Sequence, residues 1–176
     1  MAVIKDKIMK VAFFDRDGTI AKDYPDEEWA NVQEPVLLSY AIDVLKQLCK
    51  AGYKIIIITN QYIIGEGYIT EQQYREYNEK LLKVLKESGI DILDVFYCPH
   101  RRLDNCDCIK PKTGLIKAAI DKYPTINLNE SFVVGDSICD AELANNVGVA
   151  AYGIGFDYDY DKFTRINDLK ELYKLL

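Results

Sequence analysis

The sequence KVAFFDRDGT occupies residues 10–19 and joins a short apolar run to a cluster of polar residues. The apolar part, Lys10–Phe14, is typical of a buried β-strand. Two carboxylates, Asp15 and Asp17, follow it directly, and Gly18 then lets the chain turn sharply. Open α/β sheets bind ligands beyond the carboxyl ends of their strands. This stretch therefore predicts a strand and the start of a ligand site.

The rest of the chain alternates between short apolar runs and longer segments with helical periodicity. Strands are expected at Lys54–Thr59, which contains four consecutive isoleucines, and at Ile92–Tyr97, Ser131–Val134 and Val149–Ile154. Together with Lys10–Phe14 they predict an α/β fold: a Rossmann-like parallel sheet of about five strands with helices on both faces.

Helices are expected between these strands. Pro35 can open a helix that ends at Gly52. Thr70 and Gln73 form a capping-box pattern in front of a helix that ends at Gly89. Further helices are expected after a Thr113 cap, near Cys139–Asn146 and in the last ten residues.

Length and composition predict one globular domain over residues 1–176. The chain has 49% hydrophobic and 28% charged residues, which is ordinary for a globular protein. Its longest apolar run, Ile55–Ile58, is too short to span a bilayer. Met1–Lys10 lacks the continuous apolar stretch of a signal peptide. We therefore expect a cytoplasmic monomer with no membrane partner.

Charge limits the choice of ligand. The net charge is −6 and the lysines are scattered along the chain, which argues against nucleic acid as a partner. A small phosphorylated substrate remains compatible with this charge if local cations offset the acidic background.

Four polar segments follow the predicted strands, and each one alone has a plain alternative. Asp15, Asp17 and Gly18 could form a simple turn or begin a calcium loop, although a calcium loop would want a glutamate where Asp26 stands. Asp136 could bind a hard cation or merely stabilise a helix N-terminus. Their convergence is what suggests a site; the segments are 15–19, 59–61, 98–112 and 135–137.

Taken in order, these motifs resemble the four motifs of the haloacid dehalogenase superfamily. The resemblance runs from about Lys10 to Ile154 and is carried by Asp15–Thr19, Thr59-Asn60, Lys110 and the pair Asp136 and Asp140. It implies a magnesium-dependent phosphatase that works through an aspartyl-phosphate intermediate.

The resemblance also implies a role for each residue. Asp15 would attack phosphorus, and Asp17 would protonate the leaving oxygen and later deprotonate the hydrolytic water. Mg²⁺ would be held by the Asp15 carboxylate, the Asp17 backbone carbonyl and Asp136, with Asp140 in support. Because carboxylates repel a phosphate dianion, a bound cation is close to a physical requirement. The substrate contacts would come from Arg16, Thr59, Asn60 and Lys110.

A second group of candidate ligands combines three cysteines with the only histidine of the chain. Cys98, His100, Cys106 and Cys108 offer the ligand types of a closed, structural zinc site. The alternative is an exposed loop with free thiols or a Cys98–Cys106 disulfide, although cytosolic thiols usually stay reduced. Since Lys110 lies two positions beyond Cys108, we hypothesise that zinc fixes this loop and orients Lys110.

This cluster narrows the resemblance to the heptose 1,7-bisphosphate phosphatases and their histidinol-phosphate phosphatase relatives, which lack a large cap domain. The run Gly67–Glu71 is closer to the heptose branch. The implied reaction is release of the 7-phosphate from D-glycero-D-manno-heptose 1,7-bisphosphate. The alternatives are a histidinol-phosphate or other sugar monophosphate phosphatase, a nucleic-acid 3′-phosphatase, for which a basic groove is missing, and a catalytically silent zinc-stabilised binding module.

Three residues depart from the pattern of the resembled family. Ile109 stands where that family usually has an arginine, Ser137 replaces a lysine, and Tyr62 replaces a small residue. An isoleucine cannot bind a second phosphate, so a monophosphorylated substrate stays open.

Overall fold

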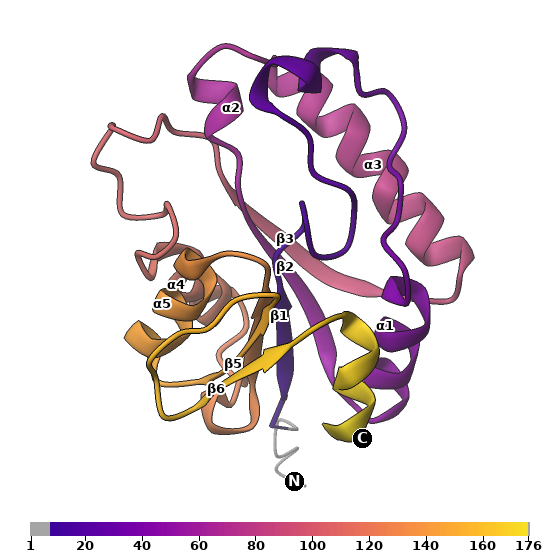
Figure 1. Ribbon diagram of the computed structural model, residues 1–176, viewed down its shortest axis with the longest axis vertical. Coiled ribbons are helices and arrows are strands. Elements are labelled where there is room, and N and C mark those ends of the chain that lie inside the picture. Colours follow the sequence, from indigo (N-terminus) through magenta and orange to yellow (C-terminus); the bar gives the residue numbers. More distant parts are fainter. Residues whose placement is uncertain (1–7, 176) are drawn as a thin grey trace, which may run out of the picture.

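The computed structural model describes residues 8–175. Residues 1–7 and residue 176 lie outside it, and so does most of the segment Met1–Lys10, for which the sequence predicts no signal peptide. The described chain contains a six-stranded parallel sheet with the order β3-β2-β1-β4-β5-β6 (Figure 1). The strands are β1 (Val11–Phe14), β2 (Lys54–Asn60), β3 (Ile92–Cys98), β4 (Phe132–Gly135), β5 (Ala150–Ile154) and β6 (Phe163–Ile166).

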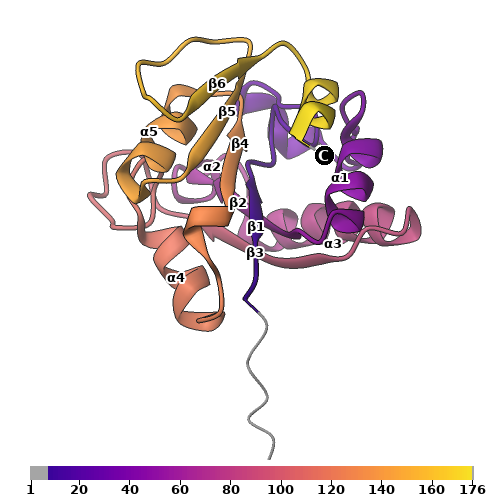
Figure 2. The same cartoon turned by 90° about the horizontal axis from the view of Figure 1, so that it is seen from below.

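Helices cover both faces of this sheet, as the sequence predicts. The helices α1, α3 and the C-terminal η3 lie on one side of the sheet, and α4 and α5 lie on the other (Figure 2). Within residues 8–175 every helix is too short or too polar to cross a membrane. The α-helices are α1 (Ala41–Lys50), α2 (Tyr62–Gly65), α3 (Glu71–Glu87), α4 (Gly114–Lys122) and α5 (Ile138–Val147), and the 3₁₀ helices are η1 (Asp26–Asn31), η2 (Leu128–Glu130) and η3 (Leu169–Leu175).

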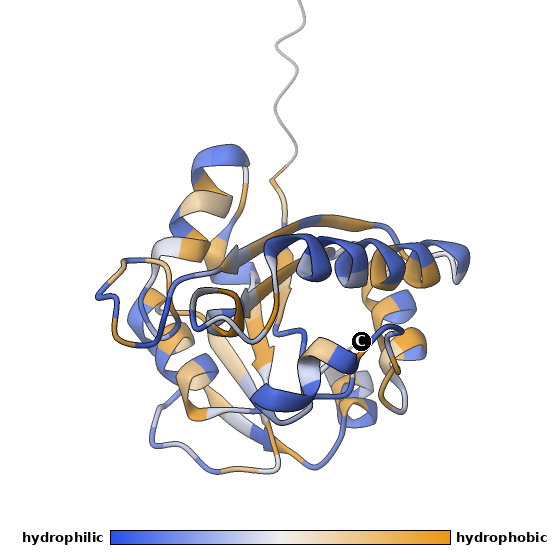
Figure 3. Ribbon diagram, turned by 90° about the horizontal axis from the view of Figure 1, so that it is seen from above, coloured by the Kyte–Doolittle hydropathy of each residue, from blue (hydrophilic) through white to orange (hydrophobic). Residues whose placement is uncertain are grey.

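The central strands are apolar on both sides because each face of the sheet is covered by helices. Side chains alternate along β1, so Phe14 packs towards α1 and α3 while Phe13 packs towards α4 and α5. Ile55–Ile58 of β2 alternate in the same way and are fully buried. Hydrophobic residues accordingly gather in the strands, and hydrophilic ones on the outer faces of the helices (Figure 3).

The first helix begins later than the sequence predicts. It starts at Ala41 and not at Pro35. The intervening residues pair with the chain that follows β1: the Lys22 amide donates to the Val36 carbonyl (2.8 Å) and the Leu38 amide donates to the Ile20 carbonyl (2.9 Å). These bonds hold the segment extended, so the apolar periodicity before Ala41 belongs to a strand-like connection.

The sheet has six strands where about five were predicted. The additional strand, β6, pairs in parallel with β5. Its two middle residues, Thr164 and Arg165, are exposed, so it lacks the continuous apolar run by which the other strands were identified. The predicted C-terminal helix is the 3₁₀ helix η3, which buries Leu169 and Leu172.

The capping box at the start of α3 is confirmed. The Gln73 amide donates to Thr70 Oγ1 (3.1 Å), and the Thr70 amide donates to Gln73 Oε1 (2.8 Å). We expect Thr70→Ala to lower the free energy of unfolding by about 1 kcal/mol, because the Gln73 amide at the helix start loses its partner, Thr70 Oγ1. Urea unfolding measures the change. Gln72→Ala, on the exposed side of the same turn, is the control and should shift it by less than about 0.5 kcal/mol; equal effects would contradict the prediction.

Candidate active site

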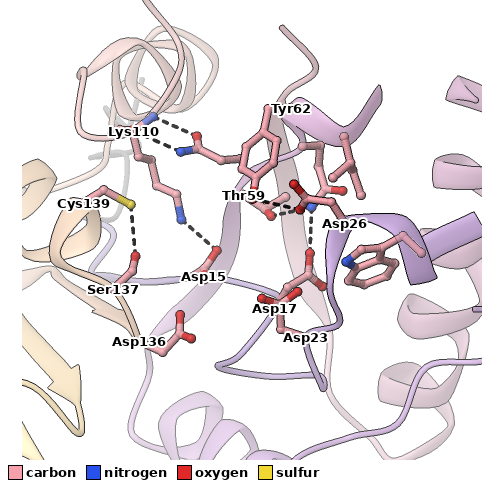
Figure 4. A pocket seen from close by; sticks show the side chains of 14 residues that line it. Asp15, Asp17, Asp23, Asp26, Thr59, Tyr62, Lys110, Asp136, Ser137 and Cys139 are labelled. Carbon is pink, nitrogen blue, oxygen red and sulfur yellow. Dashed lines mark hydrogen bonds and ion pairs between the residues drawn. The ribbon is translucent and has the colours of Figure 1, made fainter. Parts of the chain in front are cut away.

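The predicted polar residues converge at the carboxyl ends of β1, β2 and β4. Together they line a pocket of about 260 Å³. Asp15 follows β1, Thr59 lies in β2, Asp136 follows β4, and Lys110 comes from the loop after β3. Figure 4 shows these side chains pointing into one space, with the Lys110 ammonium directed at Asp15. The convergence of the four segments is therefore confirmed.

Lys110 is the central cation of this site. Its Nζ donates to Asp15 Oδ1 (2.7 Å), to Asp140 Oδ1 (2.7 Å) and to the Ile58 carbonyl (3.1 Å), and its side chain is only 2% exposed. Burial opposes its charge, but Asp140 and then Asp15 raise the pKa of Lys110 above its usual range. Burial also raises the pKa of Asp15, against the opposing effect of Lys110. The ammonium of Lys110 thus offsets the negative charge of two neighbouring carboxylates, Asp15 and Asp140.

Asp15, Asp136 and Asp140 form a group that could hold a metal ion. Each offers a carboxylate oxygen, and these oxygens lie within 4.8 Å of one another. Both oxygens of Asp140 are already used, one by Lys110 and the other by the Ser137 hydroxyl (2.7 Å). Burial, followed by the charge of Asp140, raises the pKa of Asp136 to about 6. Hard oxygen donors with excess negative charge fit Mg²⁺, with Asp15 and Asp136 as ligands and Asp140 behind them.

The turn after Asp17 requires glycine for two reasons. Gly18 has a φ of +82°, and a Cβ at this position would lie 2.0 Å from Asp136 Oδ2. A side chain here would therefore push Asp136 away from Asp15.

We expect Gly18→Ala to weaken Mg²⁺ binding by about 10- to 100-fold, because the new methyl group displaces a ligand carboxylate. Titration calorimetry with MgCl₂ measures the affinity. Gly67→Ala is a matched control, since Gly67 has a φ of +85° and no heavy atom within 4 Å of the added Cβ. The control should keep its affinity; the same loss in both variants would show that backbone strain alone is responsible.

Asp17 is held by a neighbour that lies outside the pocket. Arg16 Nε and Nη2 donate to the two oxygens of Asp17 at 2.8 Å each, and Gln61 Nε2 donates to Asp17 Oδ2 at 2.8 Å. Although burial opposes the charge of Arg16, Asp17 raises its pKa. The Arg16 side chain is 1% exposed and is not part of the pocket wall, so the predicted substrate contact of Arg16 has no support in this arrangement.

Thr59 and Asn60 both line the pocket but make different contacts. Thr59 is fully buried, and its Oγ1 accepts a hydrogen bond from Gln61 Nε2 (2.8 Å), which leaves the hydroxyl proton free for a ligand. The Asn60 amide instead binds the backbone of Lys110: Oδ1 accepts from the Lys110 amide (2.8 Å) and Nδ2 donates to its carbonyl (3.1 Å). Asn60 therefore positions Lys110.

The outer wall of the pocket was missed by the sequence prediction. It contains Asp23, Asp26 and Trp29. Tyr62, known from the sequence only as a departure from the family pattern, lines the pocket beside Asp26. The Tyr62 hydroxyl donates to Asp26 Oδ1 (3.3 Å). Asp23, Asp26 and Trp29 follow no strand end; their only signal was that the single tryptophan of the chain lies among acidic residues.

Arg102, in the loop after β3, connects residues of this wall to one another. Its guanidinium lies 4.1 Å from the ring centre of Tyr62. Its Nη2 donates to Asp26 Oδ2 (2.9 Å) and to Glu66 Oε2 (2.7 Å).

The cysteine and histidine ligands predicted for zinc are brought together in the same loop. Sulfur and nitrogen atoms of Cys98, His100, Cys106 and Cys108 lie within 4.8 Å of one another, and the Cys98–Cys106 sulfur distance is 3.5 Å. A disulfide would bring two sulfurs to about 2.05 Å, so the alternative Cys98–Cys106 bond is not formed. Three thiols and one imidazole at this spacing suit a tetrahedral zinc ion.

Comparisons with known sequences relate this chain to phosphatases. A family model described as polynucleotide kinase 3 phosphatase matches residues 10–152. A Thermoplasma volcanium protein named as a probable D-glycero-D-manno-heptose-1,7-bisphosphate 7-phosphatase is 41% identical over 140 residues, covering 79% of this chain and 94% of its own. The histidine biosynthesis bifunctional protein HisB of Campylobacter jejuni is 35% identical over 147 residues, 83% of this chain, but this chain spans only 42% of that protein.

Among solved structures, a D,D-heptose 1,7-bisphosphate phosphatase from B. bronchiseptica, complexed with magnesium and phosphate, has the same fold. It superposes with a TM-score of 0.81 over 96% of this chain and 100% of its own, at 23% sequence identity.

Proposed function

This chain belongs to the haloacid dehalogenase superfamily of phosphatases, and we propose that it hydrolyses D-glycero-D-manno-heptose 1,7-bisphosphate, releasing the 7-phosphate. The observation that carries the mechanism is the position of Asp15 in the pocket wall, with its Oδ1 bound by the buried ammonium of Lys110 (2.7 Å) and with Asp136 beside it. The heptose substrate is supported by the run Gly67–Glu71 and by a relative named as a probable heptose-1,7-bisphosphate 7-phosphatase.

In the first half of the proposed reaction, a carboxylate oxygen of Asp15 attacks phosphorus and the bond to the sugar oxygen breaks. Asp17 gives its proton to that leaving oxygen, so the sugar departs as an alcohol. Lys110 and the Thr59 hydroxyl bind the equatorial phosphoryl oxygens, whose charge grows in the transition state.

In the second half, Asp17 takes a proton from a water molecule, and the water oxygen attacks phosphorus. The bond between phosphorus and Asp15 breaks, which releases inorganic phosphate and returns both carboxyl groups to their starting states. A bound Mg²⁺ would neutralise negative charge at the phosphoryl group. Asp15, the Asp17 carbonyl and Asp136 would hold it, and Asp140 would keep Lys110 and the start of α5 in place.

One observation favours the second candidate, a phosphatase of histidinol phosphate or of a sugar monophosphate. Among the described residues, Lys110 is the only cation that lines the pocket, while Asp23 and Asp26 make the outer wall acidic. The nearby Arg102 is already paired with Asp26 and Glu66. Ile109 packs against the core on the α4 and α5 side. A second phosphate would therefore meet little positive charge. The same acidic wall disfavours a nucleic-acid 3′-phosphatase, whose substrate is a polyanion.

The deciding experiment measures phosphate release with Mg²⁺ from heptose 1,7-bisphosphate and from histidinol phosphate under identical conditions. A clearly higher kcat/KM for the heptose substrate would support the first candidate and show that Ile109 is tolerated. A preference for histidinol phosphate would support the second. If neither ester nor any other small phosphate ester is hydrolysed while Mg²⁺ still binds, the chain is a binding module.

Zinc in the loop after β3 is proposed to be structural. We expect Cys106→Ser to lose zinc and to lower turnover by about 10-fold or more, because the loop that carries Lys110 loses its anchor. Zinc content and phosphate release measure the two effects. Cys49→Ala, in α1 and away from the cluster, should change neither. A Cys106→Ser protein that lost zinc but kept full turnover and substrate preference would contradict this role.

Reduced thiols in such a cluster also fit the proposed cytoplasmic location. A monomeric state is proposed with it.

A further inference from the structure

Arg16 follows the proposed nucleophile directly, yet its side chain points away from the pocket. Its guanidinium makes a two-pronged contact with the carboxylate of Asp17, through Nε to Oδ1 and Nη2 to Oδ2, both at 2.8 Å. A planar guanidinium fixes the plane of a carboxylate as well as its position. Asp17 can therefore neither swing away nor twist without breaking one of these bonds.

An aromatic enclosure holds the guanidinium in turn. Its carbon lies 4.8 Å from the ring centre of Tyr77, 5.3 Å from that of Tyr74 and 5.6 Å from that of Trp29. Trp29 comes from η1, and the two tyrosines lie one turn apart on α3. Cation–π contacts of this kind are strengthened where water is excluded, as it is here. The orientation of Asp17 is thus set by two separate elements of the fold.

Stability alone gives little reason for a charge at this position. Arg16 Nη1 has no hydrogen-bond partner among the described residues. Buried ion pairs can often be replaced by apolar side chains of similar volume at no cost in stability. An apolar residue among three aromatic rings would pack well. The buried guanidinium is therefore better explained by what it does to Asp17.

We propose that Arg16 is a positioning residue, which holds the Asp17 carboxylate where it exchanges a proton with the leaving oxygen and with water. This inference rests on the proposed phosphatase function. It separates two roles within one short motif: Asp15 and Asp17 touch the reacting atoms, while Arg16 acts only through Asp17.

Leaving groups of different basicity test this role. A sugar alkoxide needs the proton that Asp17 supplies, whereas p-nitrophenolate leaves without one. The constant kcat/KM covers only the steps up to release of the leaving group. Arg16→Met should therefore lower kcat/KM about 100-fold for heptose 1,7-bisphosphate or histidinol phosphate, whichever is the better substrate. For p-nitrophenyl phosphate the loss should be less than about 3-fold. Arg16→Lys should recover at least about 10-fold of the alkyl-ester loss, because an ammonium can make one of the two contacts.

The controls separate positioning from a general loss of structure. Arg75→Met makes the same chemical change at an exposed site on α3 and should alter neither substrate. The Tyr77 hydroxyl has no hydrogen-bond partner among the described residues, so Tyr77→Phe should be silent, whereas Tyr77→Leu should reproduce a weaker form of the selective loss. Inhibition by inorganic phosphate should stay within about 2-fold in Arg16→Met, since the contacts of Lys110 and Thr59 are untouched.

Equal losses on both substrates, or no loss on either, would overturn the positioning role. These outcomes differ from a failure of the proposed function, in which the unaltered protein hydrolyses no phosphate ester or keeps its activity after Asp15→Asn.

Discussion

Asp15→Asn is expected to reduce phosphate release by at least about 10⁴-fold, because removing the nucleophile of a covalent mechanism leaves only the binding groups to act. The asparagine can keep the hydrogen bond from Lys110 Nζ to the oxygen at Oδ1, so the pocket should keep its shape. Burial already makes the charge of Asp15 costly, which is why its pKa is raised. The variant should therefore fold at least as stably as the parent.

Phosphate release and thermal unfolding are the two measurements. Asp121→Asn, on the exposed side of α4, is the matched control and should leave both unchanged. An Asp15→Asn protein that is folded and keeps more than about 1% of the parent activity would rule out the aspartyl-phosphate intermediate.

Lys110→Met is expected to have the second largest effect. The ammonium is the shared partner of Asp15 and Asp140, and both carboxylates stay buried when it is removed. Stranding buried charges costs about 3–5 kcal/mol of unfolding free energy. Activity should also fall by about 10³-fold, because the phosphoryl group loses its principal protein cation.

Urea unfolding without Mg²⁺ and phosphate release with Mg²⁺ measure these two losses. Lys117→Met removes an exposed lysine from α4 and should be neutral in both. Added Mg²⁺ should restore part of the lost stability in Lys110→Met, since a divalent cation also offsets the carboxylates. Unchanged stability in metal-free Lys110→Met would mean that Lys110 does not hold this cluster together.

The parts of the fold that the sequence predicted are those where local pattern and tertiary packing agree. Ile55–Ile58 are apolar without interruption because helices cover both faces of the sheet, so the run itself identifies a central strand. The start of α3 is encoded locally by Thr70 and Gln73. The start of α1 is not, because the extended pairing of Val36–Leu38 depends on residues that lie some distance away in the sequence.

The candidate site divides in the same way. Asp15, Thr59 and Asp136 could be predicted because each stands at the end of an identifiable strand. Asp23, Asp26 and Trp29 could not, since the loop and short helix that carry them have no periodic pattern. The position of Arg16 depends on rings contributed by η1 and α3, so no local pattern indicates that its guanidinium turns away from the pocket.

The central position of β1 has a consequence for the synthesis of this protein. A ribosome makes β1 early, but β1 lies between β2 and β4, and Val11 binds a residue 120 positions further along the chain. At about 5–20 residues per second, this strand waits roughly 6–24 s for its second neighbour. During that interval the apolar side chains of the first strands, mostly isoleucine and phenylalanine, lack the helices that later bury them. Incompletely synthesised chains are therefore the ones that most need a chaperone.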